Sequence, residues 1–253
     1  HRDLHRLIRR QRQMCIRDRD NIDVEYAVSR GIKVLNTPEA TATSVAELTL
    51  GLMLCVSRLI HIANDSLKGG KWLKKKLLGF ELCGKTVGLI GFGRIGREVA
   101  KRTSALGMKV LALAKHELTL NETTPYGAQP AGSLDYLLSA SDIISLHIPL
   151  TPETYHYLNW REFELMKDGV VIINTARWNI INPEALLNAL DSGKVSWAAI
   201  DVFENEPPKS EIEWKIIRHP RVLVTQHIGA QTMEAQERAG IMLAEKILKE
   251  LGK

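Results

Sequence analysis

The chain has 253 residues, of which 45% are hydrophobic and 25% are charged, a composition typical of globular proteins with a buried core. The most apolar segment, residues 48–62, is short and interrupted by Arg58 and His61, so we expect no membrane span and no membrane partner. The net charge of +5 is carried entirely by residues 1–19, which contain seven arginines and two aspartates, and the remainder is neutral.

The Arg-rich leader at 1–19 does not indicate a nucleic-acid partner. It has no apolar periodicity, no recognisable binding motif and no aromatic residues that could stack on bases. It also lacks the apolar stretch of a signal peptide. The three cysteines, Cys15, Cys55 and Cys83, show no metal or redox spacing, so we expect no metal site and a reduced, cytoplasmic setting.

Ordered patterns begin at Asp20. Ser44 and Glu47 have the spacing of a capping box, in which a hydroxyl and a carboxylate each satisfy a backbone N–H group at a helix start. Apolar residues then recur at helical spacing, which predicts a helix from Ser44 to about Arg58. The glycines at 69–70 and the lysines at 71 and 74–76 predict an exposed link.

Strands and helices alternate over the rest of the chain. Continuous apolar strands separated by helices predict an α/β fold, a doubly wound parallel sheet covered on both faces. A final amphipathic helix is expected over 232–250. The expected strands are 86–90, 109–113, 142–148, 170–174, 197–202 and 222–225, and the expected helices between them are 94–106, 134–140, 160–167 and 183–191.

A glycine-rich turn, GFGRIG at 91–96, directly follows the first expected strand and opens the helix at 94. In that context the G-x-G-x-x-G pattern predicts a dinucleotide-binding Rossmann domain. Gly91 permits the tight turn, Gly93 lets the backbone approach a pyrophosphate, and Gly96 allows the helix to pack closely on the strand. The helix N-terminus supplies N–H groups and positive potential for the phosphates.

The adenine-ribose end of this site leaves the cofactor open between NAD and NADP. NAD enzymes usually place an acidic residue at the end of the second strand, where it binds the ribose 2′-OH. That position is Ala114, followed by Lys115 and His116, so a repulsive carboxylate is absent and two groups are present that can attract a 2′-phosphate. In the alternative, Glu117 or a backbone group binds the 2′-OH, and NAD is used.

Three charged residues follow successive expected strands. Arg177 comes after strand 170–174, Glu206 lies in the segment DVFENEP that begins at the end of strand 197–202, and His227 follows the last strand. In a doubly wound sheet the carboxyl ends of the strands converge on the crevice that binds the ligand. The three side chains therefore predict a single catalytic site.

Several further motifs accompany these residues: Asn36-Thr37-Pro38, Ser44-Val45-Ala46-Glu47, His147-Ile148-Pro149-Leu150-Thr151, Asn174 to Arg177, Asp201 to Pro207 and His227 to Ala230. With them, the chain from Asp20 to about Ala239 resembles the D-isomer-specific 2-hydroxyacid dehydrogenases, with most likeness to the phosphoglycerate/glycerate dehydrogenase branch. The resemblance implies hydride transfer between NAD(P) and a small D-2-hydroxy acid or its 2-keto acid, such as phosphoglycerate or glycerate/hydroxypyruvate.

The resemblance also implies site residues, with Asp201 as the partner of the nicotinamide carboxamide. The implied catalytic residues are Arg177, Glu206 and His227. The implied cofactor-binding residues are Gly91, Gly93, Arg94, Ile95, Gly96, Ala114, Ile148, Pro149, Thr175, Ala176, Arg177, Asp201, His227, Gly229 and Ala230, and His147 is a weaker candidate on the cofactor side.

The chemistry of a 2-keto acid accounts for the three catalytic residue types. The planar guanidinium of Arg177 can bind the carboxylate and polarise the adjacent carbonyl with aligned donors. Hydride addition leaves an alkoxide that takes a proton, which His227 would donate, and would accept in the oxidation direction. Glu206, hydrogen-bonded to that imidazole, would favour its charged form and hold its tautomer.

The chain departs from the family pattern at several positions. Trp178 follows the catalytic Arg where most members have glycine, and it would narrow the crevice, cover the nicotinamide or pack outward. Gln226 replaces the usual proline before the His. Residues 1–19 match nothing in the family's substrate-binding lobe, which indicates a frameshifted, truncated or artefactual reading, with a rare native arm as the alternative.

We therefore expect four parts: a non-family leader at 1–19, a remnant of the substrate-binding domain at 20–43, a Rossmann domain at 44–229, and a C-terminal helix at 230–253 that returns toward the substrate domain. Turnover is expected to be impaired because much of the substrate lobe is absent.

The resemblance implies a homodimer formed through the 44–58 helix and the 70–72 arm. The alternative function is a non-catalytic, NAD(H)-binding dimeric scaffold, since some co-repressor relatives retain the same residues. A formate dehydrogenase ranks low because such enzymes usually have Gln in the role of Glu206.

Overall fold

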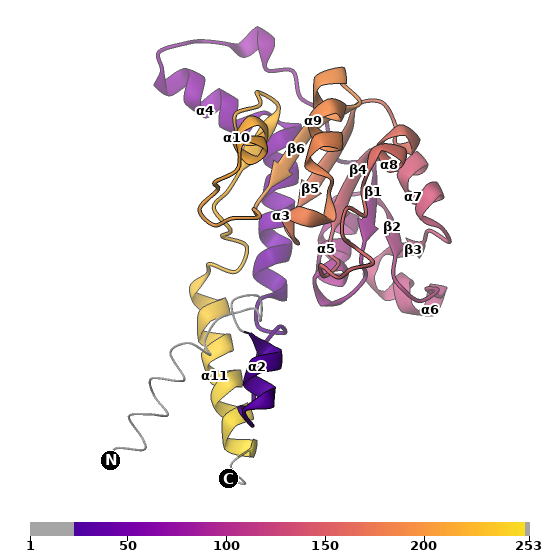
Figure 1. Ribbon diagram of the computed structural model, residues 1–253. Helices are drawn as coiled ribbons and strands as arrows, with labels where there is room; N and C mark the ends of the chain where they lie inside the picture. Colours follow the sequence, from indigo (N-terminus) through magenta and orange to yellow (C-terminus); the bar gives the residue numbers. More distant parts are fainter. Residues whose placement is uncertain (1–22, 251–253) are drawn as a thin grey trace. The chain divides into compact units, whose positions relative to one another are not determined.

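A computed structural model describes residues 23–250, which fall into two compact units (Figure 1). The larger unit is Ala46–Gly229, and the smaller one joins the described residues up to Val45 with those from Ala230 onward. The leader expected at 1–19, together with Cys15, lies outside the described residues.

The larger unit is built on a seven-stranded sheet in the order β3-β2-β1-β4-β5-β6-β7, and all neighbouring strands are parallel. The chain runs from β1 outward to β2 and β3, then returns to the other side of β1 with β4. In open α/β sheets a reversal of this kind marks the crevice that binds ligands. The strands are β1 Thr86–Ile90, β2 Lys109–Leu113, β3 Ala128–Pro130, β4 Ile143–Leu146, β5 Val170–Asn174, β6 Val195–Ile200 and β7 Val222–Val224.

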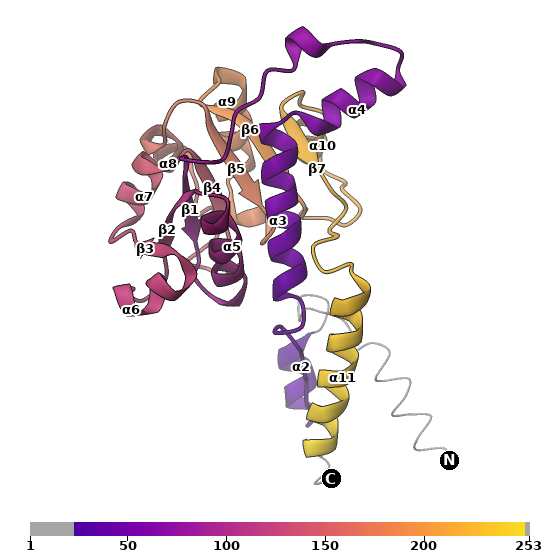
Figure 2. The same ribbon diagram turned by 180° about the vertical axis from the view of Figure 1, so that it is seen from behind.

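Helices cover both faces of this sheet (Figure 2). Successive strand residues point to opposite faces, so Leu89 and Ile173 belong to one buried cluster while Ile90 and Ile172 belong to the other. This confirms the predicted doubly wound α/β fold. The first face packs against α3 (Ala42–Ser57) and α5 (Arg94–Ala105), and the second against α7 (Leu134–Ala140), α8 (Trp160–Leu165), α9 (Pro183–Ser192) and α10 (Glu211–Ile217).

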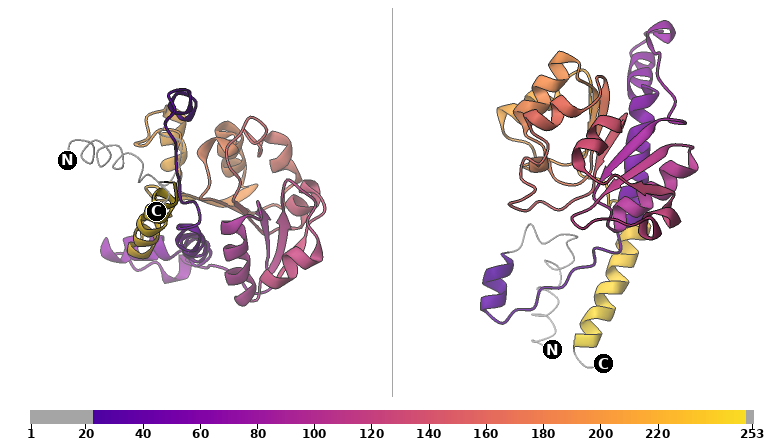
Figure 3. Two further views of the ribbon diagram at one scale, coloured as in Figure 1. Left: turned by 90° about the horizontal axis from the view of Figure 1, so that it is seen from below. Right: turned by 90° about the vertical axis from the view of Figure 1, so that its right-hand side faces the viewer.

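The predicted strands over 86–90, 109–113 and 170–174 are observed with those bounds. The strand predicted over 142–148 is shorter at both ends, and the one predicted over 197–202 lies two residues earlier. The sequence did not predict β3, because its three residues include Pro130 and the exposed Gln129 and so form no apolar run. Figure 3 shows the sheet and its helices from two further directions.

The capping box predicted at Ser44 is wrong. The helix α3 begins at Ala42, so Ser44 lies within its first turn, and the Ser44 hydroxyl pairs with the hydroxyl of Thr232 at 2.7 Å. The helix ends at Ser57, one residue before the expected end. The following helix, α4 (Ile60–Lys68), was not predicted, but the link at 69–71 and 74–76 is exposed as expected.

The smaller unit contains α2 (Val24–Ser29) and α11 (Met233–Glu250), the latter close to the helix predicted over 232–250. The segment 36–40 is fastened to α11 by polar contacts. Lys246 donates to the Asn36 carbonyl at 2.8 Å and pairs with Glu39 at 3.3 Å, and Arg238 Nε donates to the Ala40 carbonyl at 3.1 Å.

Across residues 23–250, no single helix is long and apolar enough to cross a membrane; the pair α3 and α4 passes the length and composition criteria only when joined across a 65° bend. Over the same residues, no group of three or more His, Cys, Asp or Glu side chains is arranged to hold a metal ion.

Candidate active site

The glycine turn at 91–96 joins β1 to α5 and leaves no room for side chains at two of its positions. Gly91 has φ 106°, and a Cβ there would meet the His147 carbonyl oxygen at 2.4 Å. A Cβ at Gly96 would meet the Gly91 carbonyl oxygen at 2.1 Å, so α5 packs directly on the turn. Gly93 is different: it is exposed, and a Cβ there would meet nothing within 4 Å.

This turn fits the pyrophosphate of a dinucleotide. The N-cap of α5 is Gly93, which has no side chain to accept hydrogen bonds from the N–H groups of the first turn. These donors lie at the positive end of the helix dipole, and the space where a Gly93 side chain would stand is open. Arg94 is exposed at the same end of the helix and Ile95 is half-buried. The backbone and the charge therefore suit a phosphate group.

The predicted adenine-ribose end of the site is at the carboxyl end of β2. Ala114 is half-buried there, and Lys115 and His116 are exposed. His116 Nε2 lies 3.1 Å from Glu122. The N–H and hydroxyl of Thr119, together with His116, lower the pKa of Glu122 to about 2, so this carboxylate is ionised at neutral pH.

The charge of Lys115 acts on Glu153, in the loop after β4. The Thr151 hydroxyl is the main cause of the lowered pKa of Glu153, and the charge of Lys115 adds to it. Lys115 is thus within electrostatic reach of Glu153. Glu117, the alternative partner of the 2′-OH, is exposed.

His147 packs beneath the glycine turn. Its Nε2 lies 2.9 Å from the Ser145 hydroxyl, and burial lowers its pKa to about 3, so the ring is neutral. Its carbonyl oxygen is the atom that excludes a side chain at Gly91. The structure therefore gives His147 a supporting position under the cofactor turn. Ile148 and Pro149, the predicted cofactor residues, follow it out of the sheet.

Arg177 is held by a folded loop after β5. Asn174, which is 1% exposed, accepts from the Ala176 N–H at 3.1 Å and donates to the Arg177 carbonyl at 2.9 Å. Arg177 itself donates to the Ala176 carbonyl at 2.6 Å. Burial lowers the pKa of Arg177, and the nearby charge of Glu206 opposes that change. Arg177 and Glu206 are therefore close enough to interact electrostatically. In the same loop, the Thr175 hydroxyl lies 3.0 Å from that of Thr49.

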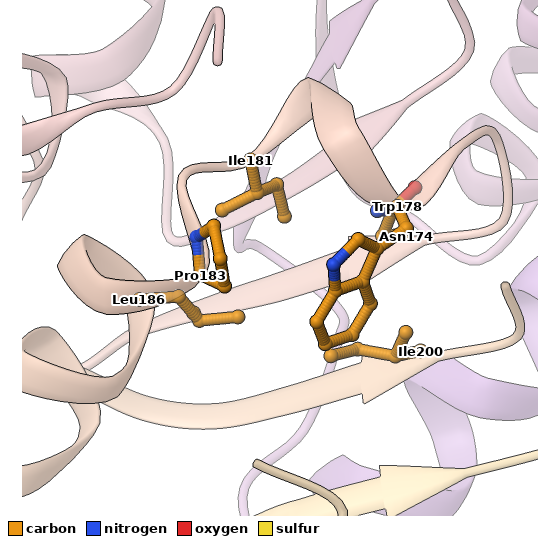
Figure 4. A pocket seen from close by; sticks show the side chains of 6 residues that line it. All are labelled: Asn174, Trp178, Ile181, Pro183, Leu186 and Ile200. Atoms are coloured by element: carbon orange, nitrogen blue, oxygen red, sulfur yellow. The ribbon is translucent and has the colours of Figure 1, made fainter. Parts of the chain in front are cut away.

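Trp178 packs inward beneath this loop, which is none of the three orientations considered from the sequence. Its indole is 5% exposed and lies 5.7 Å from the Phe203 ring, centroid to centroid. The space beside it is about the size of one water molecule and is too small for a ligand (Figure 4). That cavity is lined by Asn174, Trp178, Ile181, Pro183, Leu186 and Ile200.

Glu206 and His227 are in direct contact. His227 Nδ1 lies 2.7 Å from Glu206 Oε1 and 2.8 Å from Oε2. Because Glu206 occupies Nδ1, Nε2 is the nitrogen through which the ring can exchange a proton with a substrate. The His227 backbone has φ 52°, an uncommon value outside glycine, and such conformations persist only where surrounding contacts impose them.

Asp201 supplies those contacts. It follows β6, is 1% exposed, and accepts from the Thr225 hydroxyl at 2.6 Å. It also accepts from the backbone N–H groups of Ile228 and Gly229, each at 2.9 Å. One carboxylate thus forms hydrogen bonds with the loop on both sides of His227. A carboxylate has about four acceptor sites, so one remains for the carboxamide contact implied from the sequence.

The carboxyl edge of the sheet therefore gathers the predicted residues of the larger unit. Arg177, Glu206 and His227 lie after β5, β6 and β7, and Gly91 to Gly96 lie after β1. Ala230 is buried and is the first residue of the smaller unit's C-terminal part. The sequence-based reasoning missed Glu213, a buried carboxylate in the first turn of α10, although the Ser210-x-x-Glu213 capping box is visible in the sequence.

In this parallel sheet the chain changes the side on which it adds strands at β1, next to the glycine turn, and Arg, Glu and His lie at the carboxyl edge. These features define an oxidoreductase of the Rossmann type that uses a dinucleotide. Residues 50–229 match the family model of the D-isomer specific 2-hydroxyacid dehydrogenase, NAD binding domain. The chain belongs to this family of NAD-dependent enzymes.

Named relatives support the assignment. The chain is 54% identical over 233 residues to a hydroxypyruvate reductase of Thermotoga maritima, covering 92% of this chain and 74% of the relative. It is 44% identical to a D-3-phosphoglycerate dehydrogenase of Methanocaldococcus jannaschii, covering 92% of this chain but only 44% of that protein. The crystal structure of D-lactate dehydrogenase from Aquifex aeolicus complexed with NAD and lactic acid is similar, with a TM-score of 0.80, 34% identity and coverage of 91% of this chain and 74% of that one.

The three hydrogen bonds that Asp201 accepts from the His227 loop predict a large loss of stability for Asp201→Asn. The amide can replace only one of the two oxygens, so a buried N–H or O–H donor loses its acceptor. We expect the free energy of unfolding, measured with urea, to fall by about 3 kcal/mol. The control is Asp168→Asn, since Asp168 is 92% exposed and pairs with Lys194; here a change below about 0.5 kcal/mol is expected. Equal effects of the two changes would contradict the role of Asp201.

Proposed function

We propose that this chain carries out hydride transfer between NAD(P) and a small D-2-hydroxy acid or its 2-keto acid, with hydroxypyruvate and glycerate as the first pair to test. The observation that carries the proposal is the contact of Glu206 with His227 Nδ1, near the half-buried Arg177. The similarity to a hydroxypyruvate reductase over 92% of the chain supports the choice of substrate.

Each side chain has a task that its position suits. Arg177, half-buried in its loop, binds the substrate carboxylate and polarises the carbonyl. His227 Nε2 gives a proton to the carbonyl oxygen during reduction and takes it back during oxidation. Glu206 keeps the ring oriented and stabilises the imidazolium. The bound nicotinamide supplies or accepts the hydride. Asp201, with one acceptor site left, orients the carboxamide.

His227→Gln tests this proposal, because glutamine keeps hydrogen bonding but cannot act as an acid near neutral pH. We expect kcat/KM for hydroxypyruvate reduction to fall about 1,000-fold, a loss far larger than any change in NADH affinity, since glutamine retains hydrogen-bonding groups for the cofactor side. His219→Gln is the control: His219 pairs with Asp191 near the end of α10, and about threefold or less change in activity is expected.

Comparable activity in His227→Gln would contradict the proposal. A chain that binds NADH but shows no turnover of any 2-keto acid would also contradict it, and would favour the non-catalytic scaffold.

We also propose that the site binds NADPH nearly as well as NADH. Ala114 brings no carboxylate to the ribose, and Lys115 and His116 are exposed beside it. Fluorescence titration is expected to give dissociation constants within about tenfold of each other. Ala114→Asp should weaken NADPH at least about tenfold through charge repulsion, while Ala114→Asn, of similar shape without the charge, should not. An NADPH affinity more than about 100-fold weaker than that for NADH in the unsubstituted chain would contradict this.

A homodimer in the cytoplasm completes the proposal; its partners are a small acid and a second copy of the chain. The cytoplasmic setting is proposed from the three cysteines, whose spacing suggests neither a disulfide framework nor a metal site. Large apolar side chains are exposed along α4 and the arm after it, including Trp72 at 78% and Leu78 at 90%. Apolar surface of this kind is typical of an interface between subunits.

The dimer is tested by sedimentation velocity on the double variant Trp72→Glu, Leu78→Glu. We expect the unsubstituted chain to sediment at twice its mass of 28.4 kDa and the variant to sediment as a monomer. Leu120→Glu, at a site 62% exposed on α6 (Leu120–Thr123), is the matched control and should remain dimeric. A monomeric unsubstituted chain would contradict the proposal.

A further inference from the structure

Glu213 is a fully buried carboxylate in α10 with an unusual number of hydrogen-bond donors around it. Its Oε1 accepts from the Asn205 N–H at 3.1 Å. Its Oε2 accepts from Asn205 Nδ2 at 3.3 Å, the Lys209 N–H at 3.1 Å, the Ser210 N–H at 2.9 Å and the Ser210 hydroxyl at 2.8 Å. Five donors from three residues therefore meet at one side chain.

These donors lie on both sides of the segment that carries Glu206. Asn205 immediately precedes Glu206, whereas Lys209 and Ser210 follow the two prolines after it. The carboxylate of Glu213 therefore binds both ends of the 205–210 loop by hydrogen bonds, and Glu206 lies in the exposed middle of that loop. Glu206 is 43% exposed as a side chain and has its ring partner, His227, on a different loop. Its direction depends on the backbone on either side of it.

Helix capping alone does not account for this arrangement. A capping box satisfies the N-cap N–H with the carboxylate three residues later. Glu162 in α8 does this for Asn159, at 3.1 Å. Glu213 does the same for Ser210, but it also accepts from the Lys209 N–H and from the Asn205 N–H and side chain, which lie outside the box. Burial by itself would raise the pKa of Glu213, but the donors lower it to about 2, so the carboxylate is ionised wherever the protein is folded near neutral pH.

We propose that Glu213 is a positioning residue for the reaction: by holding the backbone on both sides of Glu206, it directs that carboxylate onto Nδ1 of His227. Glu213 acts through the loop and touches neither substrate nor cofactor. The inference rests on the proposed function for its catalytic meaning, but the Glu206–His227 contact can be observed without turnover.

Glu213→Gln is the test, because glutamine has nearly the same shape. If the amide oxygen takes the place of Oε2, the NH₂ group faces the Asn205 N–H, so two donors oppose each other. The hydrogen bond that holds the backbone next to Glu206 is then lost. The readout is the ¹⁵N NMR signature of the neutral His227 ring at alkaline pH, assigned by comparison with His227→Gln.

In the unsubstituted chain we expect the ring proton on Nδ1, facing Glu206. In Glu213→Gln we expect it mainly on Nε2, the form that an unrestrained imidazole prefers. The turnover rate with hydroxypyruvate should fall at least about tenfold, while KM and the NADH dissociation constant stay within about twofold.

Glu162→Gln is the matched control, since it removes the capping carboxylate of α8 and leaves the 205–210 loop untouched. Both variants should unfold at a lower temperature, but only Glu213→Gln should alter the His227 signature. A folded Glu213→Gln chain with the proton still on Nδ1 would overturn the proposal. If the signature changes while the unsubstituted chain shows no turnover, the proposed function fails and the positioning role stands.

A measurement on the unsubstituted chain covers the case in which Glu213→Gln does not fold. The Asn205 N–H should exchange with solvent deuterium at least about 100-fold more slowly than an unprotected loop amide, because it donates to a buried carboxylate. Exchange at the rate of an unprotected loop would overturn the proposal.

Discussion

Two of the three loops that carry the candidate catalytic side chains, those of Glu206 and His227, are held by buried carboxylates that accept hydrogen bonds from backbone N–H groups. Asp201 accepts hydrogen bonds from the loop around His227, and Glu213 accepts them from the loop around Glu206. A loop that leaves a sheet has N–H groups without strand partners, and each costs free energy if it is buried unsatisfied. A charged acceptor satisfies several of them at once. The loops can therefore be rigid while their catalytic side chains stay accessible to a substrate.

The strand order of the sheet determines which loops lie next to one another. Its parallel strands end at one edge, and the reversal between β1 and β4 separates the glycine turn from the loops after β5, β6 and β7. Contacts between neighbouring loops then set their spacing. Trp178, next to Arg177, packs on Phe203, and Asn179 donates to Glu204 at 3.3 Å. The loop that holds the guanidinium is thus joined to the loop that holds Glu206.

The fold and the position of the candidate site residues at one edge of the sheet were predictable from the sequence, whereas the details of contact were not. Buried parallel strands are continuous apolar runs, and Arg177 and His227 follow such runs closely, so their place at one edge follows from topology alone. The inward packing of Trp178 depends on Phe203 in a separate loop. Ser44 was misassigned as a helix cap because its partner, Thr232, lies 188 residues away in the chain. Glu213 could be recognised as a capping residue, but its contact with the residue before Glu206 required the loop geometry.

The central claim is that Arg177, Glu206 and His227 hold a 2-keto acid against a nicotinamide bound at the glycine turn. The most direct measurement is a crystal structure of the chain with NADH and oxamate, an unreactive analogue of a 2-keto acid. We expect the oxamate carboxylate on the guanidinium of Arg177 and its carbonyl oxygen about 3 Å from His227 Nε2, with the pyrophosphate beside Gly93. A cofactor bound away from the 91–96 turn, or an oxamate that contacts neither Arg177 nor His227, would contradict the claim.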